Sequence, residues 1–192
     1  MPHVTDDDVA ELHLAVCRRF GGAVRSAHGR WDRRSPCDEW DARAVLEHVI
    51  GFHDVLVLRP LALKPKRPRG GTSRLRGKDP QVRWQLTYDA LAEALAPGRA
   101  TQLDTRRLIP KLTRDVLVHT WDLARAVEAD DRLDPGWCEL FYADLPADLQ
   151  ASSPSGMFKA PLAVNNESSE IEVQARLLAR LGRDPSWRPE SL

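Results

Sequence analysis

The sequence predicts an all-α protein, a four-helix bundle with additional C-terminal helices. Apolar residues recur with the helical period in six successive stretches, and no run of strand length alternates cleanly between apolar and polar residues. The sequence contains no internal repeat and no Gly-rich loop of the kind that binds phosphate groups. A chain of 192 residues can bury one sizeable core. We expect residues 1–130 to form the bundle and residues 131–192 to form a helical extension packed on it.

The first two helices are expected near residues 5–27 and 41–61. Thr5 and the acidic residues after it open the first, because negative charge stabilises the N-terminus of a helix. A segment with Gly and Pro, HGRWDRRSPCDEWD, separates the two. Pro60 ends the second, since proline cannot continue a helix.

Four further helices follow a loop at residues 64–78, which has seven basic side chains and no acidic one. Asp79 and Pro80 are a typical cap and first residue for the third helix, which stops at Pro97-Gly98. The fourth runs from about 106 or 112 to 127, because Pro110 leaves its start open. The fifth begins at Asp134-Pro135, and Gly182 ends the last.

Composition limits the classes of partner. The formal net charge is zero, so no polyanionic partner is indicated, and the basic loop lacks aromatic residues that could stack on bases. We therefore expect no nucleic-acid binding. No secretory signal and no apolar run of about 20 residues is present, which predicts a cytoplasmic protein without a membrane span. Cys17, Cys37 and Cys138 are widely spaced and are expected to be free, buried or incidental thiols.

The stretch RDVLVHTWDLARA, residues 114–126, carries an unusual polar stripe. Asp115, His119 and Asp122 fall within about 60° of one another on a helical wheel, although apolar residues surround them. Buried polar groups need partners, and a metal ion is one candidate. The i, i+4 spacing lets Asp115 and His119 share an ion, while Asp122 suits an orienting role. An ion pair of Asp115 with Arg114, Arg107 or Lys111 is the alternative.

A third ligand should come from another helix, and His48 in VLEHVIGFHD is the best donor. His53 competes with it but lies about 140° around the wheel, so both cannot face one ion on a regular helix. Two histidines and one carboxylate leave coordination positions open, which favours a catalytic zinc or another divalent ion over a structural zinc. Hydrogen bonding of the histidines within the core is the alternative.

Two linked motifs, WDRRSPCDEWDARAVLEHVIG and DVLVHTWDLARA, resemble the DinB-like superfamily. The nearer similarity is to its actinobacterial branch, the mycothiol-dependent maleylpyruvate isomerase N-terminal-domain proteins, and LLARLGRDPSW resembles the end of short members of that branch. The resemblance implies an up-down-down-up bundle with a divalent metal ion held by His48, Asp115 and His119. We expect this ion to be zinc, with nickel or another divalent metal as the alternative. The family pattern has Glu at the position of Asp115, so the shorter side chain requires a helix shift or a bridging water to reach the ion.

The resemblance also implies a reaction. Members of the family activate a low-molecular-weight thiol, mycothiol, so we expect a metalloenzyme for S-transfer to, or isomerisation of, a small electrophile. His53 or Asp122 would orient a ligand or move a proton, and Arg43, Arg59 and Arg125 are candidate binders of a substrate carboxylate.

Other functions stay open. A thiol-independent hydrolase, cyclase or isomerase would use the metal through bound water, whereas a metal-binding interaction module would have no turnover. We expect the chain to lack the second domain of the full isomerase, which favours the module. The segment SPSGMFKAPLAV is a candidate cover for the metal pocket, with a surface connection as the alternative. A homodimer is also compatible with the sequence.

Overall fold

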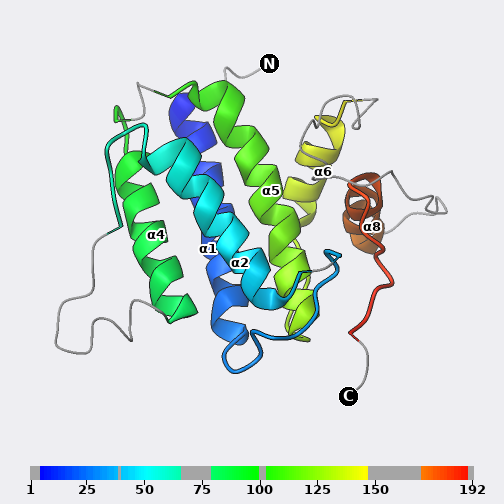
Figure 1. The fold of residues 1–192 in the computed structure, drawn as a ribbon. Coiled ribbons are helices and arrows are strands. Elements are labelled where there is room, and N and C mark those ends of the chain that lie inside the picture. Colours follow the sequence, from blue (N-terminus) through cyan, green and yellow to red (C-terminus); the bar gives the residue numbers. More distant parts are fainter. Residues whose placement is uncertain (1–4, 39, 66–78, 100–102, 147–169, 190–192) are drawn as a thin grey trace.

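The computed structural model describes residues 5–38, 40–65, 79–99, 103–146 and 170–189, and these residues form an all-helical protein without named strands. Figure 1 shows the long helices of the N-terminal part side by side, with the shorter C-terminal helices on one side of them. The segment SPSGMFKAPLAV and most of the basic loop 64–78 lie outside the described residues. The elements are α1 (Asp6–Ser26), α2 (Ala42–His53), a π-helical turn η1 (Asp54–Leu58), α4 (Pro80–Ala94), α5 (Thr105–Ala126), α6 (Pro135–Ala143) and α8 (Glu170–Arg180).

The four long helices run in two opposite directions (Figure 1). Arg106 at the start of α5 pairs with Asp6 at the start of α1, so these two helices are parallel. Arg83 near the start of α4 pairs with Glu47 in the first half of α2, so these are parallel as well. Phe20 late in α1 packs on Trp84 early in α4, which makes the two pairs antiparallel. In chain order the helices therefore run up, down, down and up.

Side chains at the helix starts explain where the helices begin. Thr5 and Asp8 form a capping box at α1, in which each side chain accepts from the other residue's backbone N–H. Asp41, Asp79 and Asp134 accept backbone N–H groups at the starts of α2, α4 and α6. Such caps satisfy donors that the helix itself leaves unpaired, which stabilises each helix by roughly 1 kcal/mol.

The predicted second helix, residues 41–61, divides into two elements. Regular α-helix ends at His53, and the chain continues as the π-helical turn η1, where the Arg59 N–H donates to the Asp54 carbonyl. The wider turn leaves Val55 and Leu56 exposed and Leu58 buried. Spacing of apolar residues cannot predict such a turn, because it changes the helical period itself.

The helix α5 is the centre of the core. It packs against both α1 and α2, and most of its residues are buried. It begins at Thr105, so Pro110 lies inside its second turn, where the proline removes one backbone donor. Because α5 is covered on several sides, its polar residues Asp115, His119 and Asp122 are buried as well, and each requires a partner.

The C-terminal part of the chain docks on the bundle through α6, α8 and the residues that follow. The helices α6 and α8 pack together, and Leu177, Leu178 and Leu181 are buried. Gly182 has a φ of 76°, which ends the helix and turns the chain back, so that Arg183 reaches α5. A boundary near residue 130 between bundle and extension remains a prediction.

Within the part of the chain that the structure describes, no helix combines the length and the apolar composition that are needed to span a bilayer.

Candidate metal centre

His48 from α2 and Asp115 and His119 from α5 converge at one point between the two helices. The distance from His48 Nε2 to Asp115 Oδ2 is 3.3 Å, and that from His119 Nε2 to the same oxygen is 3.7 Å. The three candidate ligand atoms all lie within 4.8 Å of one another. The sequence-based set thus comes together in space, and Asp115 reaches both imidazoles from its own position in α5.

These distances fit a shared ion. Two donor atoms bound tetrahedrally at about 2.1 Å lie about 3.4 Å apart, close to the separations of Asp115 Oδ2 from the two nitrogens. The side chain of His119 is 2% exposed and that of His48 is 23% exposed. A ligand from solution would therefore approach the ion from the side of His48.

The two ring nitrogens of His119 have different surroundings. Nδ1 donates a hydrogen bond to Asp122 Oδ2 at 2.9 Å, which fixes the ring and leaves Nε2 to face Asp115. Nε2 is buried and has no hydrogen-bond partner among the described residues. A buried nitrogen without a partner is unfavourable, and a metal ion at this position would satisfy it.

Behind His119 lies a charged pair that links the C-terminal segment to α5. Arg183 Nη2 donates to Asp122 Oδ2 at 3.0 Å, and the side chain of Asp122 is fully buried. The Cys37 thiol, which precedes α2, also donates to Asp122 Oδ2 at 3.1 Å. Asp122 therefore joins three segments of the chain and accepts a hydrogen bond from the candidate ligand His119.

The charges at the site follow from these contacts. Burial alone would raise the pKa of Asp122, but Arg183 and His119 outweigh it and hold the pKa far below the usual range. Burial also opposes ionisation of Asp115, yet His119 and His48 lower its pKa overall. Burial and the Asp122 charge raise the pKa of the Cys37 thiol. Both carboxylates are thus ionised at neutral pH, and Cys37 is a neutral thiol.

Aromatic side chains line the outer side of the site. The ring of Trp40 lies 4.9 Å from that of His48 and is stacked on His119 at 5.8 Å, between centroids. Phe52 contacts His48 edge to face at 5.3 Å. Trp40 and Phe52 are both partly buried, so each offers apolar surface beside the partly exposed imidazole of His48.

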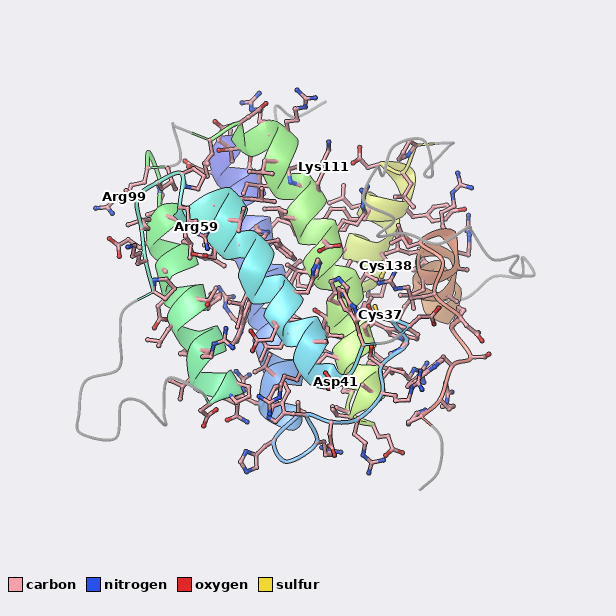
Figure 2. The ribbon with its side chains drawn as sticks, in the orientation of Figure 1. Cys37, Asp41, Arg59, Arg99, Lys111 and Cys138 are labelled. Carbon is pink, nitrogen blue, oxygen red and sulfur yellow. The ribbon has the colours of Figure 1, made fainter. Side chains whose placement is uncertain are left out.

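The structure places the other predicted site residues elsewhere. His53 turns toward α1, because five residues along α2 rotate its side chain away from His48. Arg59 pairs with Asp54. Figure 2 shows Arg59 well away from Cys37, which lies beside the candidate ligands. Arg125 pairs with Asp131, while Arg43 is exposed. No described contact joins these four to the candidate ligands, so the expected proton-transfer and carboxylate-binding roles gain no support.

A second polar cluster, formed by His13 and Cys17 of α1 and His53 of α2, lies in the core of the bundle, and the sequence analysis did not anticipate it. All three side chains are fully buried. His13 Nε2 lies 3.1 Å from His53 Nε2 and 3.5 Å from Cys17 Sγ. A signal was available, since His13 and Cys17 have the same i, i+4 spacing as Asp115 and His119. Arg183 was also missed, because no local spacing relates it to Asp122.

Burial sets the protonation of this second cluster. It lowers the pKa of His13 to about 4 and, with the neighbouring His13, lowers that of His53 well below its ordinary value. Burial also raises the pKa of the Cys17 thiol. All three groups are therefore neutral at pH 7 when no metal is bound.

Comparisons with models of known protein families, with curated proteins and with solved structures found no match. The resemblance to the DinB-like superfamily therefore depends on the motifs quoted above.

Proposed function

We propose that the chain is a metalloenzyme of the DinB-like type, in which His48, Asp115 and His119 hold one divalent metal ion. Zinc is the ion that we propose. The substrates of the enzyme would be a low-molecular-weight thiol such as mycothiol and a small electrophile, and its reaction S-transfer or thiol-assisted isomerisation. The up-down-down-up order of the four long helices supports the family, since it is the order that the resemblance implies.

One observation carries the metal site: the orphaned Nε2 of His119. The other ring nitrogen, Nδ1, donates to an ionised Asp122, which leaves Nε2 facing Asp115 and His48 without a hydrogen-bond partner among the described residues. This is the arrangement in which metal-binding histidines are commonly held. Three protein ligands would leave a position open, as catalytic sites do.

The charges favour an anionic substrate atom. Asp122 is balanced by Arg183, so Asp115 alone would oppose the charge of a divalent ion. The occupied site would keep one positive charge, which a thiolate sulfur would neutralise. When bound, the ion would supply the positive charge that lowers the pKa of a thiol into the neutral range.

The cysteines of the chain itself do not provide this sulfur. Burial raises the pKa of Cys17, Cys37 and Cys138, so each is a thiol rather than a thiolate at neutral pH in the metal-free chain. Cys37, the thiol beside the site, donates its proton to Asp122. An attacking thiolate would therefore come from a small molecule.

Each remaining residue at the site has a role that follows from its contacts. Arg183 and Asp122 keep His119 in position. Trp40 and Phe52 exclude water from one side of the ligand cluster and offer a hydrophobic wall to the carbon part of a substrate.

The test is consumption of mycothiol by zinc-loaded protein with a panel of small electrophiles, including maleylpyruvate. We expect thiol-dependent turnover in the wild type that is lost in His119→Gln and kept in His28→Gln, a matched change at an exposed histidine. Turnover without any thiol would favour the hydrolase, cyclase or isomerase alternative. Tight zinc binding without turnover on any electrophile would contradict the enzyme and leave a metal-binding module.

A further inference from the structure

We propose that His13, Cys17 and His53 form a second metal site, separate from the first, that takes one soft monovalent cation, Cu⁺. The three side chains come from α1 and α2 and lie on the side of α2 that faces α1. His48, on the same helix, points instead toward α5. The two sites therefore use opposite sides of α2, and the proposal does not depend on the function of the first.

The separations of the three ligand atoms suit one ion. His13 Nε2 and His53 Nε2 are 3.1 Å apart, and Cys17 Sγ lies 3.5 Å from the first and 4.0 Å from the second. Around a three-coordinate ion, with angles of about 120° and bonds of about 2.1 Å to nitrogen and 2.3 Å to sulfur, the two nitrogens lie about 3.6 Å apart and each nitrogen lies about 3.8 Å from the sulfur. Small side-chain adjustments would bring the three observed distances to these values.

Hydrogen-bond accounting shows that His13 presents a lone pair to the cluster. Thr113 donates its hydroxyl proton to the Ile109 carbonyl at 2.7 Å, so its oxygen can only accept from His13 Nδ1, 2.9 Å away. His13 Nδ1 therefore carries the proton, and His13 Nε2 has none. This is the same arrangement that orients His119 in the first site.

His53 cannot satisfy both of its nitrogens in the metal-free cluster. If Nε2 carries the proton and donates to His13, Nδ1 is left buried without a hydrogen-bond partner of good geometry. If Nδ1 carries it, near the Val49 carbonyl one turn earlier, two lone pairs face each other across 3.1 Å. A cation between the nitrogens removes that repulsion and makes the second arrangement favourable.

Charge and coordination number select the cation. A thiolate and two neutral imidazoles carry one negative charge, which Cu⁺ balances, whereas Zn²⁺ would leave a net positive charge in a fully buried place. Cu⁺ binds thiolate and imidazole readily and is stable with three ligands, while zinc normally completes four. The group of candidate ligands found among the described residues holds only these three.

Binding involves one proton and no electron. The Cys17 thiol gives its proton to the solvent as the sulfur–copper bond forms, and copper enters and remains as Cu⁺. Because the site is fully buried, loading requires transient opening of the helix bundle or refolding with the ion.

The test is a competition between the full chain and bicinchoninate for Cu⁺ without oxygen. We expect wild type to bind one Cu⁺ and Cys17→Ser to bind it at least about a hundredfold more weakly, since loss of a ligand should exceed the effect of an outer-shell change. Cys138→Ser is the matched control, because Cys138 is an equally buried thiol in α6. His119→Gln, which removes a ligand of the first site, should keep its Cu⁺ affinity.

X-ray absorption at the copper edge of wild type gives a second readout that needs no variant. It should show one sulfur and two nitrogen ligands. A spectrum without sulfur, equal affinity in Cys17→Ser and wild type, or no binding by wild type even after refolding with Cu⁺ would overturn the proposal.

Discussion

His119 Nδ1 donates to Asp122 Oδ2 across 2.9 Å, and Arg183 holds the same carboxylate from the C-terminal segment at 3.0 Å. Asp122 lies one turn beyond His119 in α5, so the bond stays on one helix face. Its carboxylate fixes the ring of His119 with Nε2 toward Asp115 and His48. The properties of the candidate metal centre should therefore respond to residues that would not bind the ion.

Asp122→Asn is expected to weaken Zn²⁺ binding by about 10- to 100-fold, because a neutral amide holds His119 less firmly and makes its Nε2 a poorer donor. Competition with a chelating indicator measures this affinity. Asp130→Asn, at a carboxylate that is 59% exposed and paired with Arg132, is the matched control and should bind as wild type does. Equal affinity in the two variants would show that Asp122 has no positioning role.

Arg183→Met should destabilise the protein by about 3 to 5 kcal/mol, since it leaves the buried charge of Asp122 without its partner. Urea unfolding of the metal-free protein measures the change. Arg188→Met alters an exposed arginine whose described hydrogen bonds go only to nearby backbone carbonyls, so it should change stability by less than about 0.5 kcal/mol. A loss in Arg183→Met no larger than that would contradict the pairing.

Stability of the metal-free protein should fall as the pH drops from about 6.5 to 4. Burial lowers the pKa of His13 to about 4. Between pH 6.5 and 4, His13 is therefore protonated in the unfolded chain but neutral in the folded chain, and each step down in pH favours unfolding. Each such histidine contributes a slope of about 1.4 kcal/mol per pH unit, and His53 adds in the same direction. The pKa values of Asp115 and Asp122 are lowered in the folded chain, so the stability that these two carboxylates contribute is lost only below about pH 4.

Urea unfolding at several pH values, with chelator present, measures this slope. In His13→Gln the slope should be smaller, whereas His28→Gln, at an exposed position, should leave it unchanged. Parallel slopes in wild type and His13→Gln would show that His13 is not held neutral by the fold.

Gly21 of α1 lies against the side chain of Trp84 in α4. A Cβ atom there would lie 2.9 Å from Trp84 Nε1, and Trp84 is buried. We expect Gly21→Ala to destabilise the protein by about 1 to 3 kcal/mol. Gly22→Ala, where the nearest atoms are arginine tips at 3.7 Å or more, should stabilise it by up to about 1 kcal/mol through helix propensity. Stabilisation by both substitutions in thermal unfolding would contradict the tight contact.

Local patterns predicted the helices and indicated the first group of candidate ligands, each for a physical reason. Thr5, Asp79 and Asp134 act on backbone groups a few residues away, so their capping roles are visible in the sequence. The stripe on α5 was visible because Asp115 and His119 share one helix face. The η1 turn and the ion pair between Asp122 and Arg183, 61 residues apart, depend on packing that no local period encodes.

The second cluster shows a different limit. Its i, i+4 pair, His13 and Cys17, is as visible in the sequence as the pair on α5, but the roles expected of His53 all belonged to the first site, as a competitor of His48 or as a proton-transfer group. The rotation of about 140° that made His53 a poor ligand for the first site is what turns it toward α1. A residue that fails one expected role can thus indicate a second site on the opposite helix face.

The zinc content of the chain tests the central claim most directly. It is best measured in Cys17→Ser protein, so that the buried cluster contributes no ion, after dialysis against Zn²⁺ and then buffer. The account predicts one zinc ion per chain, lost when His119→Gln is added and kept when His28→Gln is added. No zinc in the parent protein, or the same zinc content with and without His119, would contradict a metal centre at His48, Asp115 and His119.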